Sequence, residues 1–336
     1  MSSSVPAMSV ILVTPDRFDT IRETVSYLAQ QTDANQLELV IVCPFEEELQ
    51  YPQEFCSGFA GVHIVALNAE IPNTGIANAA GIQQATAPVI ALAEDHCFPE
   101  PLWAKALIAR HNGPWAAVGP VFKNANPENS VSDADLLMAY GPWLHPGAEG
   151  PMDFLPGHNS SYKRDALLQF EQRLPDLLAN EFNLHSALRA AGHRLYCEPG
   201  AIVAHTNFSR WASFVAASYL SAQQFAGSRS TEWTLLKRIV YGAAAPLIPL
   251  VRLRRIALQA RNGRFGLLRF LASVPALIAG LIISAAGETM GYLLGCGNSR
   301  QRLVPYEFHR YRHTVSGDNN QAAAQSQPTA VAGLSS

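Results

Sequence analysis

Three adjacent side chains that can bind a cation follow one apolar run of the sequence. Residues 89–93 (VIALA) have the pattern of a buried strand, which leads directly into Glu94, Asp95 and His96. Carboxylates are costly to bury unless a cation, a metal ion or hydrogen bonds compensate their charge. Such a group of ligands at a strand end is typical of a divalent ion that holds a phosphate. The alternative is a solvated turn between a strand and a helix, and position alone leaves both open.

A second candidate for chemistry is Glu181, because its neighbours have the spacing of one helix face. The stripe has intervals of four, three, four and three residues and consists of Leu177, Glu181, Leu184, Leu188 and Ala191. Burial in an apolar stripe raises the pKa of a carboxyl group, which makes it a better proton acceptor near neutral pH. The spacing therefore favours a general base at Glu181. The alternative is the edge of the stripe, where Glu181 pairs with His185.

The elements before residue 120 alternate between apolar runs and helical periodicity, which is typical of parallel strands covered by crossover helices. We expect strands at residues 9–13, 37–43, 62–67, 89–93 and 116–118, and a helix after Thr14 and Pro15. Ligands bind beyond the carboxyl ends of the strands in such a doubly wound sheet. Thr14, residues 43–46 and residues 94–96 should therefore line one crevice.

Composition excludes several classes of protein. With 48% hydrophobic and 15% charged residues over 336 positions, the chain is too apolar for a disordered scaffold. A net charge of −3 argues against general nucleic-acid binding, which requires a basic face. The 5 cysteines show no CxxC spacing, so we expect neither a zinc ribbon nor a disulfide framework. Free cysteines indicate a reducing compartment. The first apolar run has no basic leader and the length of one strand, so we expect no signal peptide and a cytosolic location for most of the chain.

The region between Glu232 and Glu288 contains no acidic residue but many arginines. Its apolar run at 239–251 is too short to cross a membrane, whereas 270–287 has about the length that spans a hydrocarbon core of about 30 Å. We expect a basic interfacial anchor, either a re-entrant hairpin or one span, held by arginines at anionic headgroups. The alternative is a helical hairpin of a soluble core. The predicted organisation is a catalytic domain at 1–230, this helical region at 231–297 and a tail at 298–336 that is disordered after about 315.

Several ordered segments resemble the family 2 glycosyltransferases of GT-A fold. The first are strand, helix, strand, then Asn73-x-Gly75, then residues 93–99 followed by Trp103. Segments 157–164, 180–184, 188–192 and 199–205 continue the likeness, which covers about residues 7–225. The resemblance implies a GT-A fold, Rossmann-like with a mostly parallel sheet and helices on both faces, to which the helical membrane-associated region is added.

The resemblance implies inverting transfer of a sugar from a nucleotide diphosphate to a hydroxyl group, with a metal ion on the diphosphate. Glu181 corresponds to the family's catalytic aspartate. The usual Asp-x-Asp pair reads Glu94 and His96 here, so the metal ligand is either His96 or Asp95, and His205 is at the position of a second, downstream ligand. An imidazole ligand favours Mn²⁺ over Mg²⁺.

The resemblance also implies two groups of substrate-binding residues. The donor group is Thr14, Pro15, Arg17, Glu46, Asn78, Glu94 and Asp95. The acceptor group is Trp103, Gly157, His158, Asn159, Tyr162 and Arg164. The chain departs from the family pattern in the donor pocket, where Glu46 stands in for a strand-end aspartate and Asn78-Ala79 replaces an arginine-asparagine pair.

We therefore expect a metal-dependent inverting glycosyltransferase at the cytoplasmic face of a membrane, with membrane lipids and no nucleic acid as partners. Its acceptor is a glycan or a lipid-linked saccharide, as in the synthesis of cell-surface polysaccharides. The alternative is a non-catalytic, membrane-associated protein of the same fold that binds glycans or nucleotide sugars. A nucleotidyltransferase is disfavoured because residues 14–17 lack a glycine-rich phosphate loop.

Overall fold

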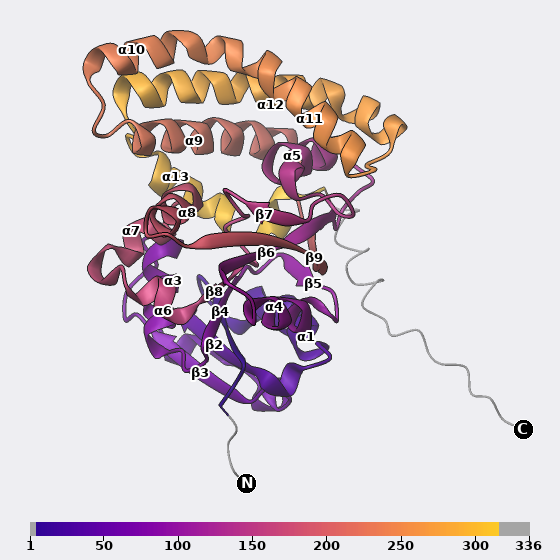
Figure 1. The fold of residues 1–336 in the computed structure, drawn as a ribbon, viewed down its shortest axis with the longest axis vertical. Coiled ribbons are helices and arrows are strands. Elements are labelled where there is room, and N and C mark those ends of the chain that lie inside the picture. Colours follow the sequence, from indigo (N-terminus) through magenta and orange to yellow (C-terminus); the bar gives the residue numbers. More distant parts are fainter. Residues whose placement is uncertain (1–4, 316–336) are drawn as a thin grey trace, which may run out of the picture.

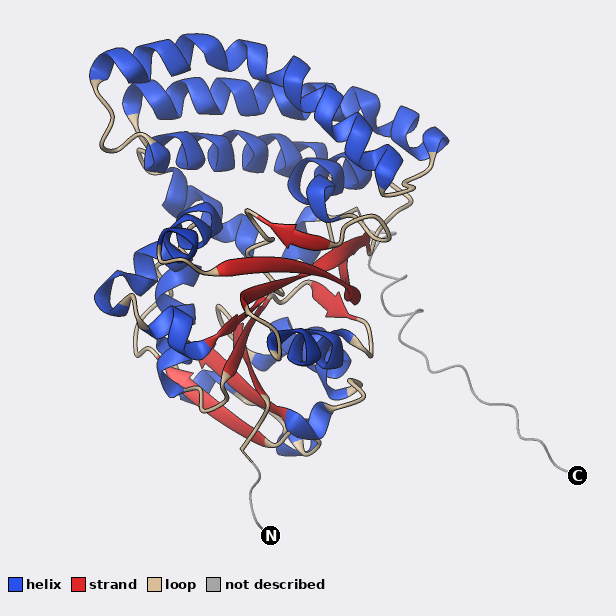
Figure 2. Ribbon diagram, viewed as in Figure 1, coloured by secondary structure: helices blue, strands red, loops and turns tan. Residues whose placement is uncertain are grey.

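The computed structural model describes residues 5–315 and contains a nine-stranded mixed sheet. The strands follow one another across the sheet in the order β3-β2-β1-β4-β8-β6-β9-β5, and β7 pairs with β9. Their bounds are β1 Met8–Val13, β2 Leu37–Cys43, β3 Gly61–Ala66, β4 Val89–Ala93, β5 Cys97–Pro99, β6 Trp115–Asn124, β7 Gly150–Met152, β8 Ser161–Lys163 and β9 Arg194–His205. Figure 2 shows these strands in red, with helices against the sheet and a separate layer of helices beyond it.

The first half of the sheet is parallel, as the apolar runs predict. Strands β1, β2, β3 and β4 pair in parallel, with Met8 opposite both Leu37 and Val89. Every residue of β1, β2 and β4 is buried, because helices cover both faces of the sheet. The covering helices in this half are α1 Phe18–Ala29, α2 Glu46–Leu49 and α3 Thr74–Gln84, whereas α4 Trp103–His111 packs against β6 and β9. The predicted α/β class, with a parallel half-sheet covered on both faces, is confirmed.

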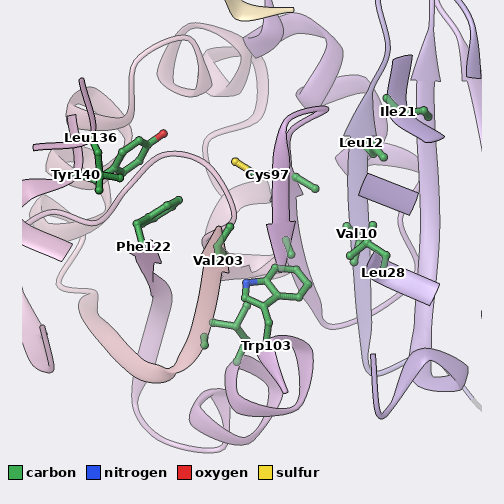
Figure 3. Close-up of a cluster of buried hydrophobic side chains, with 14 of the residues drawn as sticks. Val10, Leu12, Ile21, Leu28, Cys97, Trp103, Phe122, Leu136, Tyr140 and Val203 are labelled. Carbon is green, nitrogen blue, oxygen red and sulfur yellow. The ribbon is translucent and has the colours of Figure 1, made fainter. Parts of the chain in front are cut away.

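The second half of the sheet reverses direction and brings distant segments together. Strand β8 is antiparallel to both β4 and β6, and β9 is antiparallel to β5, which places Cys97 opposite His205. The cluster in Figure 3 fills the space between this half and α1, with Trp103 and Phe122 almost completely buried. The helices here are α5 Ser130–Tyr140, α6 Arg164–Leu168, α7 Leu174–Leu178 and α8 Glu181–Ala190.

A layer of long helices packs above the sheet in Figure 1. It consists of α9 Trp211–Arg229, α10 Leu235–Ala244, α11 Ile248–Asn262 and α12 Leu267–Leu294. Small residues let α9 and α12 approach closely, since a Cβ on Gly287 would lie 2.3 Å from the carbonyl oxygen of Tyr219. Helix α9 therefore packs with the helical layer, although the sequence places residues up to 230 in the catalytic domain.

The chain returns to the sheet after the helical layer. Helix α13 spans Ser299–Glu307, and a 3₁₀ turn follows at Arg310–His313. In Figure 1 this yellow segment lies between the long helices and the sheet. The interpretation of residues 298–315 as a tail is therefore wrong, because they fold against the catalytic domain. The disorder predicted after about residue 315 falls outside the described residues.

Candidate active site

Four side chains with metal-ligating atoms converge where β4, β5 and β9 meet. Glu94, His96, Cys97 and His205 each offer one such atom, and these atoms lie within 4.8 Å of one another. The Oε2 atom of Glu94 is 3.7 Å from Nε2 of His96 and 3.9 Å from Nε2 of His205. The sequence expectation that His205 joins the Glu94–His96 segment agrees with this geometry, which follows from the antiparallel pairing of β5 and β9.

Both histidines turn Nε2 toward this centre. Nδ1 of His205 lies 2.8 Å from Oδ1 of Asn207, an acceptor, so the ring proton is on Nδ1. Burial, together with the nearby His96 and Arg310, holds the pKa of His205 well below its usual range, so the ring is neutral. Nδ1 of His96 lies 2.5 Å from the Asp95 carboxylate, which orients that ring in the same way. Two imidazole rings and one carboxylate are a donor set that fits a divalent metal ion.

Asp95 and Cys97 support this centre in different ways. The Asp95 carboxylate is engaged through Oδ1 by His96 and through Oδ2 by the backbone N–H of His309, at 3.0 Å. Burial and the neighbouring Glu94 hold the pKa of Cys97 well above its usual range, so its thiol keeps the proton that it donates to Glu94. Of the two ligand candidates in the sequence motif, His96 turns a ligand atom toward Glu94 and His205, whereas both carboxylate oxygens of Asp95 are engaged elsewhere.

The electrostatics of the site are dominated by Glu94 and His158. Nδ1 of His158 lies 2.9 Å from Oε1 of Glu94. Burial disfavours the charge on His158, but Glu94, with Glu181 and Glu307 nearby, outweighs it and raises the pKa to about 9. Burial also opposes the charge of Glu94, yet His158 and His96 hold its pKa well below its usual range. At neutral pH the pair is therefore an imidazolium and a carboxylate.

Glu181 is near this pair, but the helix argument used to predict it is wrong. Helix α7 ends at Leu178, and a new helix begins at Glu181, where Asn180 caps it by accepting from the backbone N–H of Phe182. Leu177 and Glu181 therefore do not share a helix face, and Glu181 is exposed rather than desolvated. It does not pair with His185, which is buried against Tyr162.

The position of Glu181 beside the site depends on Gly157 instead. A Cβ on Gly157 would lie 2.9 Å from Cβ of Glu181, so only a glycine permits this contact. His158 follows directly and reaches Glu94 on its other side. Glu94 and Glu181 thus flank the turn at residues 157–158.

The remaining donor-side residues lie around the carboxyl ends of the parallel strands. Thr14 is buried, and its hydroxyl donates to the backbone oxygen of Arg17, so it shapes the loop that also contains Pro15. Arg17 and Glu46 are exposed at the starts of α1 and α2. The side-chain oxygen of Asn78 is buried and has no hydrogen-bond partner within residues 5–315.

Three of the acceptor-side residues cannot contact an acceptor directly. Trp103 and Tyr162 are fully buried; the Trp103 indole donates to the backbone oxygen of Asn159, and Tyr162 contacts His185. Arg164 lies at the opposite edge of the sheet, since β8 is antiparallel to β4 and the Arg164 N–H donates to Pro88. The expectations for Trp103 and Tyr162 are wrong because both side chains are buried in the core. The expectation for Arg164 is wrong because the matching segment continues along β8 to the far end of that strand. Asn159 is itself 1% exposed, so Gly157 and His158 are the accessible members of the group.

The C-terminal segment also contributes to the site, which the sequence did not predict. His309 lies 3.2 Å from Asp16, and Nη2 of Arg310 lies 2.9 Å from Nε2 of His96. The basic run at residues 309–313 (HRYRH) was the available signal.

Comparisons with known proteins agree with this fold. Residues 9–169 match the model of glycosyl transferase family 2. A solved mannosyltransferase, PcManGT from Pyrobaculum calidifontis in complex with GDP-Man and Mn²⁺, is similar at a TM-score of 0.55 and 15% identity, over 85% of this chain and 87% of that one. GalNAc-T7 with UDP, GalNAc and Mn²⁺ is similar at a TM-score of 0.46 and 15% identity, over 60% of this chain. The likeness spans only 44% of the length of GalNAc-T7. A search of curated proteins gives no match.

The doubly wound half-sheet, its mixed extension and the ligand cluster at their junction define a GT-A glycosyltransferase domain. Residues 9–169 form a domain of glycosyl transferase family 2. Glu181 and His205 lie beyond the matched residues, so their place in the site rests on the geometry above.

Proposed function

We propose that this chain is a metal-dependent, inverting glycosyltransferase that moves a sugar from a nucleotide-diphosphate donor to a hydroxyl of a glycan or lipid-linked acceptor. The observation that carries the proposal is the convergence of Glu94, His96 and His205 at the carboxyl end of β4. The accessible carboxylate of Glu181 lies across the turn at residues 157–158 from this centre.

Glu94, His96 and His205 would hold the divalent ion, and the two imidazoles favour Mn²⁺ over Mg²⁺. When bound, such an ion neutralises the charge that develops on a diphosphate leaving group. Asp95 and Asn207 contact Nδ1 of the two rings, so that Nε2 of each ring is the atom available to a metal ion. His158 neutralises the other oxygen of Glu94, so that one carboxylate oxygen faces the two rings.

Glu181 would act as the general base. Its carboxylate accepts the proton of the acceptor hydroxyl while that oxygen bonds to the anomeric carbon and the diphosphate leaves. One displacement from the opposite face inverts the anomeric configuration and requires no covalent intermediate. An exposed position at the first turn of α8 suits this role, because the acceptor must reach the carboxylate from solvent.

The helical layer would place the domain on a membrane. Helix α12 is long and apolar enough to cross a bilayer, with a mean hydropathy of 2.0, and 44% of its most apolar window is buried against other helices. This helix and its neighbours carry large apolar side chains that are more than half exposed: Leu235, Leu236 and Val240 in α10, Leu250 and Val251 in α11, and Leu267, Leu268 and Leu271 in α12. Arginines accompany them, as in helices that lie in an interface with anionic lipids. Docking of this face at the cytoplasmic side would bring lipid-linked acceptors close to the site.

The replacement Glu181→Gln tests the catalytic assignment. Transfer from the matching nucleotide sugar should fall by roughly a hundredfold or more, while Mn²⁺-dependent donor binding stays within about twofold. Glu171→Gln, which removes another exposed carboxylate, is the matched control and should keep full activity. Normal turnover in the Glu181 variant would contradict the assignment. Donor binding by the wild type without turnover, over a broad acceptor panel, would favour a non-catalytic sugar-binding protein.

A further inference from the structure

The C-terminal segment lies across the carboxyl ends of β1 and β4, where the nucleotide sugar would bind. The backbone N–H of His309 donates to Asp95, and its ring lies 3.2 Å from Asp16. Asp16 follows β1 and Asp95 follows β4, so His309 bridges the carboxyl ends of two neighbouring strands. His309 also has a φ of +52°, a left-handed conformation that non-glycine residues adopt only where surrounding contacts impose it.

Arg310 occupies the ligand atom of His96. Its Nη2 lies 2.9 Å from Nε2 of that ring, and its guanidinium carbon lies 3.9 Å from the centre of the Phe208 ring. Arginine can only donate, so Nε2 of His96 accepts and the ring proton is on Nδ1, facing Asp95. The electron pair on Nε2 takes one partner at a time. Arg310 and a metal ion therefore exclude each other at this atom.

The guanidinium of Arg310 lacks a counter-ion at contact distance. The residue is only 9% exposed, its Nε has no hydrogen-bond partner, and among residues 5–315 no carboxylate forms an ion pair with it, although Asp135 and Glu307 interact with its charge at longer range. A buried cation that donates only to an imidazole nitrogen carries a large desolvation cost. The planar fork of a guanidinium matches the oxygens of a phosphate. Both facts indicate that an anion completes this position.

We propose that Arg310 binds the diphosphate of the nucleotide-sugar donor, and that in the nucleotide-free protein its guanidinium holds the cation position at His96. This inference rests on the proposed function and adds the C-terminal segment to the donor site. When the diphosphate binds, the guanidinium turns from the ring to the phosphate oxygens and frees Nε2 of His96. Diphosphate and metal ion then enter the site cooperatively, whereas the metal ion alone competes with Arg310.

The test compares Arg310→Met with wild type in two binding experiments on the full-length protein. In the first, Mn²⁺ is titrated without nucleotide and followed by the loss of the free-ion paramagnetic resonance signal. In the second, UDP and GDP are titrated without metal by calorimetry. The variant should bind Mn²⁺ roughly tenfold more tightly, because its competitor is gone, and the better of the two nucleotides roughly tenfold or more weakly, because a charged hydrogen bond is lost. Arg312→Met, which removes an exposed arginine of the same segment, should leave both affinities unchanged.

Opposite changes in the two affinities separate this role from a loss of folding, which would weaken both. Arg310→Lys gives a second variant that keeps the charge but not the fork; it should retain weak Mn²⁺ binding and lose part of the nucleotide affinity. Equal Mn²⁺ and nucleotide affinities in wild type and the Met variant would overturn the proposal. If wild type binds neither nucleotide at any Mn²⁺ concentration, the proposed function fails as well, and the metal titration still decides whether Arg310 holds the cation position.

Discussion

The ion pair between His158 and Glu94 predicts a pH-dependent part of the stability of the folded chain. The pKa of His158 is about 9, against 6.5 for an isolated histidine, because Glu94 outweighs the effect of burial. Such a difference corresponds to about 3.4 kcal/mol for a pair shielded from water. The His158 side chain is 43% exposed, so solvent screens the pair, and we expect about 1 kcal/mol.

The sign of the pH dependence follows from the raised pKa. Above pH 6.5 the folded state binds a proton at His158 that the unfolded state releases, so stability decreases as the pH rises. The contribution is complete below 6.5 and lost once the pH passes about 9.

Urea unfolding of wild type and His158→Gln measures this contribution. The variant should be about 1 kcal/mol less stable at about pH 6, and the difference should vanish by about pH 9.5. His193→Gln, at a histidine that contacts Gln169 on the surface, is the control and should show no such pH-dependent difference. A difference between wild type and the His158 variant that is the same at both pH values would refute the ion pair as its cause.

Two further predictions concern the metal-binding histidine and the membrane. Asp95→Asn should weaken Mn²⁺ binding roughly tenfold in a paramagnetic resonance titration, because the ring of His96 loses the carboxylate that orients it. Asp133→Asn, at a carboxylate paired with Arg269, is the control and should leave the Mn²⁺ affinity unchanged. Equal Mn²⁺ affinity in wild type and the Asp95 variant would show that Asp95 does not position the ring. Leu250→Glu combined with Val251→Glu should lower co-sedimentation with phosphatidylglycerol vesicles by about tenfold or more. Leu102→Glu, at an exposed leucine of the catalytic domain, is the control and should have little effect. Undiminished sedimentation of the double variant would show that another surface attaches the protein to the membrane.

The parallel half of the fold could be predicted because its strands are buried on both faces. Continuous apolar runs therefore mark β1, β2 and β4 with almost correct bounds. Strand β6 extends to Asn124, well past the predicted end at 118, because its later residues pair with β9. Such pairing joins segments about 80 residues apart and leaves no local pattern.

The site was only partly predictable for the same reason. Local sequence patterns place Glu94, His96 and His205 at strand ends, but they do not show that these ends meet. The family resemblance alone predicted that His205 joins Glu94 and His96 in one site. The helix break before Glu181 was missed although Asn180, a good N-cap residue, marks it. Arg310 reaches His96 across 214 residues of sequence, and nothing near either residue predicts that contact.

The central claim is that Glu94, His96 and His205 form a cation-dependent site for a nucleotide sugar. Thermal unfolding of wild type, His96→Ala and His205→Ala with a panel of nucleotide sugars, with and without Mn²⁺, tests it most directly. We predict that at least one nucleotide sugar raises the melting temperature of wild type in the presence of Mn²⁺, and that either substitution removes this shift. A shift of equal size in both variants, or none in wild type with any nucleotide sugar, would contradict the claim.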